Sequence, residues 1–390
     1  MRIAMVTAAY LDVGVGGVES HVYEVSRQLR LRGHDPIVFR TSSGAARLRP
    51  PADVPLVVLR PGRLPSPYQR SPVTEVARRI LNGFQAVGQA DRVVGTTPDV
   101  VHFHDLCEAL PMALWLRRRL PAAQVWTNHL GEFLALARYP AGRTVTRLLT
   151  APYRLGIGPS SELARQDACR PPMRFISNGY DPARFYPVSP ACRASLRAGF
   201  GLDPDQFVVL VPRRWAPTKG VLHFAHAVRR WVPSGRTATV LFAGSGTDRY
   251  AAYQEEVRRA LAGAAVEVRT LGAVATADMP ALYQVTDLTV VPSLKEATSL
   301  SAIESLGCGV PVLGTRVGGL LDLGDACGDC LTLVRPGDPD ALLGGLSMFF
   351  RPEYRWDGER AAQIAAEIEK RFSWASVAES VERVYLEAMA

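Results

Sequence analysis

Two glutamates stand eight residues apart in the stretch KEATSLSAIESLGCGVPVLGTRVGG, which occupies residues 295–319. Glu296 follows an apolar run, and Glu304 lies in a segment with helical spacing. A buried carboxylate is costly unless a partner compensates it. Because both side chains can reach one ligand lying along the start of the helix, the pair predicts a ligand rich in hydroxyl groups.

The start of that helix adds an anion site to the two carboxylates. Thr298 or Ser299 is expected to cap the helix, and its first backbone N–H groups are free to bind phosphate. A ligand that has hydroxyl groups close to phosphates is typically a nucleotide sugar. We therefore expect Glu304 to bind the ribose hydroxyls and Glu296 the hydroxyls of the transferred sugar.

A basic turn, VPRRWAPTKG at 211–220, lies between a predicted strand and a predicted helix and contains Arg213, Arg214 and Lys219. The chain has three lysines against 42 arginines, so a lysine at 219 indicates a need for a compact charge. Arg214 and Lys219 are predicted to neutralise a diphosphate leaving group. The alternative is an exposed basic turn without a ligand.

A glycine-rich turn, GVGGVESH at 14–21, again follows a strand and precedes a helix. Gly16 and Gly17 allow a ligand to approach the backbone closely. The spacing is not that of the GxGxxG dinucleotide fingerprint, and no acidic residue ends the second strand. The motif alone is weak.

Alternating strands and helices position these residues and predict parallel sheets covered by helices. In the front half, Val18, Val22, Val25 and Leu29 keep helical spacing, and Gly33 ends that helix. Predicted strands there lie within 2–10, 35–39, 54–60, 99–105, 123–129 and 154–160. In the second half they lie within 207–214, 237–246, 266–272, 288–293, 311–315 and 331–337.

The expected fold class is α/β, with two Rossmann-like doubly wound domains that face a central cleft. A polar, proline-containing segment at 178–193 links them, and the boundaries are predicted at 1–187 and 188–373. A helix at 374–390 is a candidate to pack back on the first domain. Such folds bind ligands at the carboxyl ends of their strands.

Composition narrows the class of protein. The 390 residues are 47% hydrophobic, no uninterrupted apolar run reaches 18 residues, and the six cysteines are scattered. The N-terminus lacks the features of a signal peptide, so a cytoplasmic protein is expected. Residues 1–185 carry 24 Arg against 14 Asp and Glu, a charge of +10, and the remainder carries −2. That excess leaves peripheral contact with an anionic membrane open, whereas no pattern for nucleic-acid binding appears.

Four motifs in order give the chain a resemblance to the retaining GT-B glycosyltransferases of family 4 (glycosyl transferases group 1). These are GGVE, RRWAPTKG, the E-x7-E of Glu296 and Glu304, and GCGVPVLGTRVGG, and the segment ISNGYDPARFYP is also similar. The resemblance extends over almost the whole chain. It implies a hexosyltransferase-type enzyme that uses a nucleotide diphosphate sugar and retains the anomeric configuration.

The resemblance also implies roles for individual residues. Glu296, His129, Arg214 and Lys219 would be catalytic. The donor would contact these residues and Gly16, Gly17, Val274 (in the turn 271–274), Ala297, Thr298, Ser299, Leu300 and Glu304. Candidates on the acceptor side are Glu19, His104 and Asn128. His104 and His129 each have the alternative of being ordinary histidines at strand ends.

The chain departs from the family pattern after the first glutamate, where E-G-F-G is usual and Glu296-Ala297-Thr298-Ser299 stands here. The donor sugar therefore cannot be carried over; UDP is the favoured nucleotide and GDP the alternative. The acceptor is a small molecule such as a sugar, cyclitol, thiol or natural-product core. Its choice is expected to rest on the first-domain segments 64–74 and 131–147.

No cofactor and no metal are expected. The CGDC segment at 327–330 lacks a second cysteine pair, and free thiols are favoured. The two DPD segments, at 203–205 and 338–340, read as turns ahead of helices that aspartate caps.

Retention without an evident nucleophile fits departure and attack on the same face, with the leaving diphosphate as base. Domain closure would bring Gly16 and His129 to the donor. Three alternatives remain: a membrane-surface enzyme with a lipid acceptor, a non-catalytic nucleotide-sugar binding protein and an NAD-dependent oxidoreductase, whose glycine spacing is missing. A homodimer is left open.

Overall fold

The computed structural model describes residues 1–8, 10–11, 16–41, 51–59, 80–81, 83–104, 109–129, 139, 141–165, 167–246, 250–351, 354 and 356–390. The chain divides into two compact units. The first unit is Met1–Asn178 with Trp374–Ala390, and the second is Gly179–Ser373.

The boundary between the units falls after Asn178, nine residues before the expected position at 187. Long-range contacts explain the difference. The Tyr180 N–H donates to the Phe372 carbonyl at 2.8 Å, Tyr180 forms a bridge with Ser373, and Phe185 joins the apolar core of the second unit. From Gly179 onward, the segment predicted as a linker is therefore built into the second unit.

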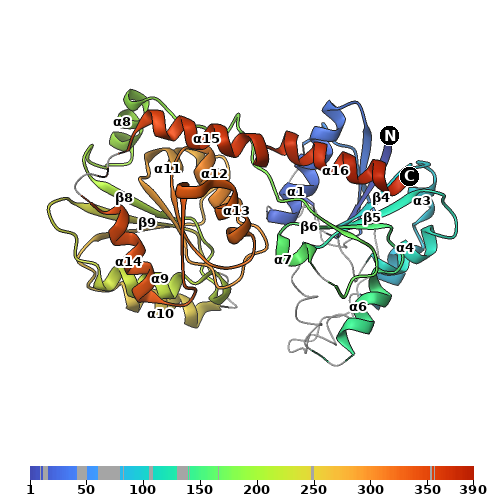
Figure 1. Cartoon of the computed structure of the whole chain (residues 1–390), viewed down its shortest axis with the longest axis horizontal. Coiled ribbons are helices and arrows are strands. Elements are labelled where there is room, and N and C mark those ends of the chain that lie inside the picture. Colours follow the sequence, from blue (N-terminus) through green and yellow to red (C-terminus); the bar gives the residue numbers. More distant parts are fainter. Residues whose placement is uncertain are drawn as a thin grey trace. The chain divides into compact units, whose positions relative to one another are not determined.

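The first unit is a parallel sheet with helices on both faces (Figure 1). Its strand order is β3-β2-β1-β4-β5-β6-β7. The elements are β1 (Arg2–Thr7), α1 (Gly17–Leu31), β2 (Asp35–Arg40), β3 (Leu56–Val58), α3 (Asp91–Val94), β4 (Val100–Phe103), α4 (Leu110–Leu116), β5 (Ala123–Thr127), α6 (Gly142–Thr150), β6 (Leu155–Gly158), α7 (Ser161–Ala164), β7 (Met173–Phe175) and α16 (Trp374–Met389).

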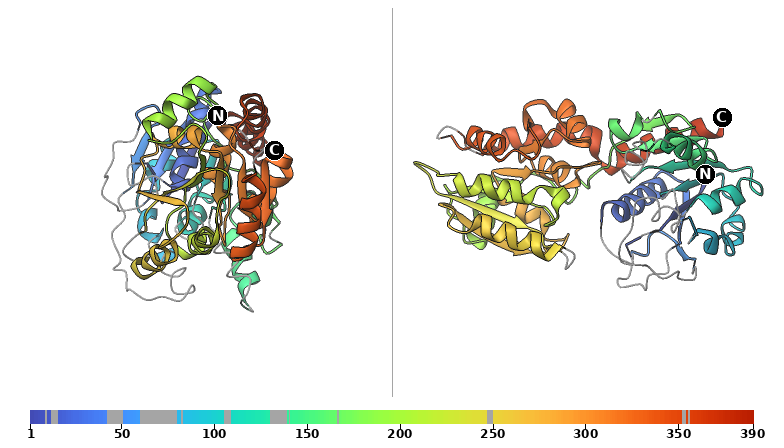
Figure 2. Two further views of the ribbon diagram at one scale, coloured as in Figure 1. Left: turned by 90° about the vertical axis from the view of Figure 1, so that its left-hand side faces the viewer. Right: turned by 90° about the horizontal axis from the view of Figure 1, so that it is seen from below.

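Helix α16 follows the whole second unit in sequence but packs on the first, beside α1 and over β5. Figure 2 shows the chain's N-terminal strand and C-terminal helix in the same unit. The buried Tyr385 hydroxyl lies 2.7 Å from His102 Nδ1 and 3.6 Å from Met5 Sδ, which fixes the helix to β4 and β1. On the opposite face, Val101 and Phe103 pack with α3 and α4.

The second unit has a parallel sheet in the order β10-β9-β8-β11-β12-β13. Its elements are α8 (Pro190–Gly199), β8 (Phe207–Val211), η1 (Pro217–Lys219), α9 (Val221–Arg230), β9 (Ala238–Ala243), α10 (Ala251–Leu261), β10 (Glu267–Gly272), α11 (Met279–Val285), β11 (Leu288–Val291), α12 (Leu300–Gly307), β12 (Val312–Thr315), α13 (Gly319–Cys327), η3 (Gly328–Cys330), β13 (Leu331–Val334), α14 (Pro339–Phe349) and α15 (Gly358–Phe372).

Alternate residues of the central strand β8 enter two different apolar cores, as the two-residue period of a strand requires. Val208 and Leu210 pack with α11, α12, α13 and α15, whereas Phe207, Val209 and Val211 pack with α9, α10 and α14 (Figure 1). Both faces of the sheet are therefore covered by helices, which is the doubly wound α/β fold that was predicted.

Each sheet has one point where the order of its strands reverses. In the first unit it lies between β1 and β4, and in the second between β8 and β11. Ligands of doubly wound folds bind at the carboxyl ends of the strands beside this point. Across the described residues, none of the helices has both the length and the apolar character needed to span a bilayer.

Candidate functional site

Four side chains meet in the second unit where β8 and β11 end. Arg213 follows β8, Lys219 lies in η1, and Ser293 and Glu296 follow β11. Lys219 Nζ lies 3.0 Å from Glu296 Oε2, and Arg213 Nη2 donates to the same oxygen. Ser293 Oγ donates to this oxygen at 3.0 Å and accepts from Arg213 Nη2 at 2.9 Å. A carboxylate and two cations thus form one connected network.

The network sets the charges of its members. Burial alone would raise the pKa of Glu296, but the positive charges of Arg213 and Lys219 outweigh burial and lower it. Burial, followed by the charge of Arg213, lowers the pKa of Lys219 to about 8. At neutral pH the glutamate is ionised and the lysine still carries its proton.

Arg213 was recognised as part of the basic turn, but only its neighbour Arg214 and Lys219 were predicted to bind a ligand. The structure buries Arg213 (7% exposed) and exposes Arg214. Arg213 also donates to Ser301 Oγ at 2.6 Å and so joins the loop after β8 to helix α12. The turn after a strand breaks the strand's alternation, so sequence alone cannot decide which of two adjacent arginines points inward.

The two glutamates differ in what compensates them. Glu296 is paired with Arg213 and Lys219. Protein cations therefore compensate this buried carboxylate, and its binding to the hydroxyl groups of a sugar stays a prediction. Glu304 Oε2 instead accepts a hydrogen bond from the Tyr283 hydroxyl at 3.1 Å, and burial raises the pKa of Glu304 to about 7. Its carboxylate has no salt bridge among the described residues.

The turn 297–300 leads directly into α12, which begins at Leu300. Ser299 caps the helix by accepting from the Ala302 N–H at 3.3 Å, so of the two expected caps it is Ser299 that serves. Ala297, Thr298 and Leu300 are half-buried. A Cβ on Gly319 would meet the Ala297 carbonyl oxygen at 2.4 Å, which explains a glycine opposite the turn.

A second glycine lets the loops after β8 and β11 touch. Gly220 has a φ of +66°, and a Cβ there would lie 1.8 Å from the Pro292 carbonyl oxygen. The glycine that follows Lys219 in sequence is therefore what allows the lysine-bearing turn to reach Glu296.

Val274 lies just beyond the carboxyl end of β10 and packs against the core that contains α11 and α12. It occupies the same edge of the sheet as Arg213 and Glu296. Strand β10 is, however, separated from β8 by β9.

In the first unit, Gly16 precedes α1 and Gly17 is its first residue. Glu19, in the first turn, folds its carboxylate back over the start of the helix. A Cβ on Gly16 would lie 2.5 Å from Glu19 Oε2, so the glycine leaves room for this acidic group. The carboxylate faces the positive end of the helix dipole.

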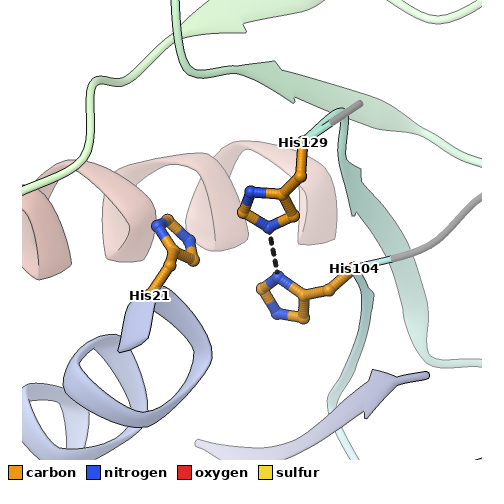
Figure 3. A group of neighbouring side chains, drawn as sticks. All are labelled: His21, His104 and His129. Atoms are coloured by element: carbon orange, nitrogen blue, oxygen red, sulfur yellow. Dashed lines mark hydrogen bonds between the residues drawn. The ribbon is translucent and has the colours of Figure 1, made fainter. Parts of the chain in front are cut away.

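His104 and His129 follow β4 and β5, and the structure brings them together with a third histidine, His21 of α1 (Figure 3). His104 Nδ1 lies 3.1 Å from His129 Nε2. His21 Nδ1 lies 2.7 Å from Asn178 Oδ1. Burial holds the pKa of His104 and of His129 well below the usual value and lowers that of His21 to about 4.

Sequence reasoning missed His21 as a site residue. A signal was present, because His21 stands four residues before Val25 on the apolar face of its helix and in its second turn. Asn128, expected on the acceptor side, is buried, and its Nδ2 finds no hydrogen-bond partner among the described residues.

The structure also describes the two DPD segments, the cysteines of the CGDC segment and part of the predicted acceptor segments. Asp338 caps α14 by accepting from two backbone N–H groups at 3.0 Å, but Asp203–Asp205 precede strand β8, so a helix cap there is wrong. Cys327 and Cys330 are free and buried. The expected acceptor segment 64–74 and residues 131–138 and 140 of the segment 131–147 lie outside the described residues.

Comparison with known proteins agrees with the fold of the two units. A family model described as Glycosyltransferase Family 4 matches residues 15–212, and one described as Glycosyl transferases group 1 matches residues 206–350. Among solved structures, sucrose-phosphate synthase from Thermosynechococcus elongatus superimposes with a TM-score of 0.78 at 18% identity, covering 99% of this chain and 98% of the other. Anabaena HepE in complex with UDP gives 0.75 at 19%, with 99% and 100% coverage. These likenesses show the GT-B fold.

Curated relatives include D-inositol 3-phosphate glycosyltransferase 2 of Catenulispora acidiphila, which is 30% identical over 95% of this chain and 90% of the relative. Phosphatidyl-myo-inositol mannosyltransferase of Mycobacterium leprae is 28% identical over 99% and 96%. The match to D-inositol 3-phosphate glycosyltransferase of Saccharomonospora viridis, 32% identical, covers 57% of this chain and about half (52%) of that relative. From the two family models and these relatives, the chain belongs to glycosyltransferase family 4.

Proposed function

We propose that this glycosyltransferase takes a sugar from a nucleoside diphosphate sugar, with UDP as the first candidate and GDP as the alternative. It would transfer the sugar, with retention of configuration, to a small hydroxyl-bearing acceptor. A cyclitol or cyclitol phosphate is the acceptor class to test first, because the names of two relatives specify inositol 3-phosphate.

The observation that carries the proposal is the network of Arg213, Lys219 and Glu296 at the strand-order reversal of the second unit. The ionised Glu296 can accept hydrogen bonds from sugar hydroxyls. Lys219 has three N–H donors, two oxygens of Glu296 within reach, and a side chain that is 18% exposed. It therefore retains capacity to bind a diphosphate.

The rest of the donor would extend along the start of α12. The N-terminus of this helix favours an anion, and the residues 297–300 lead into it. Glu304 lies just over one turn further along the helix, with Tyr283 fixing one of its oxygens. The other oxygen would accept from a ribose hydroxyl once the group is ionised.

In the proposed reaction, the bond between the anomeric carbon and the diphosphate oxygen breaks while the acceptor oxygen attacks the same face. The proton of the acceptor hydroxyl passes to the departing diphosphate oxygen. Lys219 and the exposed Arg214 would stabilise the charge that develops on the diphosphate. No protein nucleophile is required, and we propose that the two cations make a divalent metal unnecessary for donor binding.

His129 would act as a neutral imidazole in this scheme, because burial holds its pKa well below the usual value. A neutral ring can accept a hydrogen bond from a sugar hydroxyl or donate one to it, but it is a poor general acid.

A lipid acceptor is the second candidate. The mannosyltransferase of Mycobacterium leprae is named for phosphatidyl-myo-inositol, and the first 185 residues carry a charge of +10. Co-sedimentation with vesicles, with and without anionic lipid, separates this candidate from an enzyme that acts only on free acceptors.

The proposal is tested by calorimetric titration of UDP and GDP into wild type, Lys219→Met and Glu304→Ala. One diphosphate should bind wild type and lose at least about tenfold in affinity in both variants. Transfer from the matching sugar nucleotides to inositol and inositol phosphate is then followed, and NMR of the product gives the anomeric configuration. Binding without transfer to any acceptor would favour a non-catalytic binding protein. Absence of binding by every diphosphate would overturn the proposal.

A further inference from the structure

Three histidine rings from separate elements converge in the first unit. His21 comes from α1, His104 from the residue after β4, and His129 from the loop after β5 (Figure 3). One ring nitrogen from each lies within 4.8 Å of those of the other two. In the described part of the chain, this is where three potential metal ligands come together.

Hydrogen bonds orient the rings toward one another. Asn178 Oδ1 can only accept, so His21 carries its proton on Nδ1, and Nε2 presents a lone pair. That nitrogen is fully buried and has no hydrogen-bond partner among the described residues. A neighbouring ring, His102, is held by Tyr385 and Thr127, each at 2.7 Å, and lies against His104 with 4.1 Å between centroids and the rings tilted by 37°. His102 therefore positions His104 and has no nitrogen to spare.

Burying these histidine rings without a ligand costs free energy. His21 and His104 are 0% and 3% exposed, and His21 Nε2, which would bind the metal, has no partner in the described structure. An unsatisfied buried nitrogen costs roughly 1–3 kcal/mol.

We propose that His21, His104 and His129 bind one late first-row divalent metal ion, with Zn²⁺ as the test ion. Neutral imidazoles suit Zn²⁺, Co²⁺, Ni²⁺ and Cu²⁺. Tetrahedral Zn²⁺ with Zn–N bonds of about 2.0–2.1 Å needs nitrogens about 3.3 Å apart. The 3.1 Å between His104 Nδ1 and His129 Nε2 is close to that value, and the three ligand atoms lie within 4.8 Å of one another, so His21 would have to move closer to the other two rings.

The surroundings suit a metal in two further respects. Asn178 on His21 is the outer hydrogen-bond partner that metal-bound histidines commonly have. His129 is only half-buried, so an ion can reach the group, and three protein ligands leave a fourth position for water or another oxygen.

This site departs from the expectation that the protein holds no metal, and it shares one residue with the proposed transfer reaction. When His129 Nε2 binds a metal, it cannot also bind a sugar hydroxyl. The metal would thus be expected to change donor-sugar recognition and not diphosphate binding, which the second unit performs.

The test uses full-length, untagged protein freed of metal with a chelator. Titration with Co²⁺ should give one ion per chain and the visible absorption of tetrahedral cobalt, and Zn²⁺ should displace it. His21→Ala and His129→Ala should lose the band, and Asn178→Ala should lose roughly tenfold in affinity. His226→Ala, which removes an exposed histidine of the second unit, is the matched control.

Circular dichroism establishes that each variant folds. The wild-type titration decides the matter even when a variant does not fold, because absence of a tetrahedral cobalt spectrum at one equivalent would overturn the proposal. Unchanged binding by folded His21→Ala would overturn it as well. Neither outcome bears on UDP binding, which is measured separately.

Discussion

Lys219 donates to both carboxylate oxygens of Glu296, with Nζ 3.2 Å from Oε1 and 3.0 Å from Oε2. This contact joins the loop after β8 to the loop after β11. It keeps the glutamate ionised, and it holds a partly desolvated ammonium group in a fixed position. An ion pair of this kind both orients a hydrogen-bond acceptor for a sugar and places a charge for a diphosphate.

Affinity for UDP is expected to fall as pH rises through about 8, the pKa of Lys219. Below that pH the ammonium is present, whereas above it binding must also take up a proton. Calorimetry in buffers of different ionisation enthalpy measures both effects. Lys219→Arg, whose guanidinium stays charged, should bind UDP with a flatter pH profile. Identical profiles in the two proteins would show that Lys219 does not contact the diphosphate.

Glu304 is expected to make stability depend on pH. Its pKa in the folded state, about 7, lies above the ordinary value of 4.5. The stability that it contributes is therefore fully present below pH 4.5 and is lost as pH rises through about 7. Compared with Glu304→Gln, wild type should lose melting temperature over this interval. A constant difference between the two melting curves would contradict the raised pKa.

Ionisation of Glu304, which lowers stability, should increase the affinity for UDP. Ribose hydroxyls are donors, so UDP should bind more weakly to wild type as pH falls below about 7. In Glu304→Gln, UDP affinity should be lower by roughly tenfold between pH 7 and 8, and the part of the fall below pH 7 that protonation of Glu304 causes in wild type should be absent. Titration of UDP at matched pH values in both proteins provides the measurement.

Gly220→Ala should destabilise the second unit by about 3 kcal/mol or more, because the new Cβ would lie 1.8 Å from the Pro292 carbonyl oxygen at a φ of +66°. Gly235→Ala is the matched control, since Gly235 has a φ of +76° and no atom within 4 Å of its Cβ position. The control should lose only the stability that a non-glycine residue costs in the left-handed conformation, roughly 1 kcal/mol. Urea unfolding of the two variants gives the difference, and equal losses would show that the loop contact is unimportant.

Asp287 connects helix α8 to the sheet. Its carboxylate accepts from Arg193 Nη2 at 2.8 Å and from the Val208 N–H at 2.8 Å, and Arg197 lies 3.5 Å away. Asp287→Ala should cost about 3–5 kcal/mol because it leaves buried guanidinium groups without their partner.

An exposed pair supplies the comparison. Glu379 accepts from Arg383 at 2.9 Å, and the two side chains are 52% and 65% exposed. Glu379→Ala should cost less than about 1 kcal/mol. Equal losses of stability from Asp287→Ala and Glu379→Ala in denaturant unfolding would show that breaking the buried ion pair costs no more than breaking the exposed one.

The pattern of apolar residues predicted most of the architecture, because strand and helix periods are local properties of a sequence. The apolar run Phe207–Val211, the helix beginning after Ser299 and the helix Trp374–Met389 all follow from neighbouring residues. The short strand β7 (Met173–Phe175) was missed, because three half-exposed residues at a sheet edge carry little periodic signal.

The site was less predictable, because its contacts join residues far apart in the chain. The choice between Arg213 and Arg214 depends on where Glu296 lies, more than eighty residues later. His21 meets His104 and His129 only through the order of the strands. The pairing of Glu296 with protein cations could not be seen from its own segment, so its sequence was read as requiring a ligand.

Helix α16 affects the order in which the two units complete their folds during synthesis. A ribosome adds about 5–20 residues per second, and domains usually fold as they emerge. The second unit is complete once Ser373 has emerged, but the first still lacks Trp374–Ala390. Until then, the face of β1 and β4 that carries Met5 and His102 has no Tyr385 to cover it. The part of the protein that is synthesised first is therefore finished after the part that follows it. During that interval, a nascent chain would expose an apolar sheet face to chaperones or to aggregation.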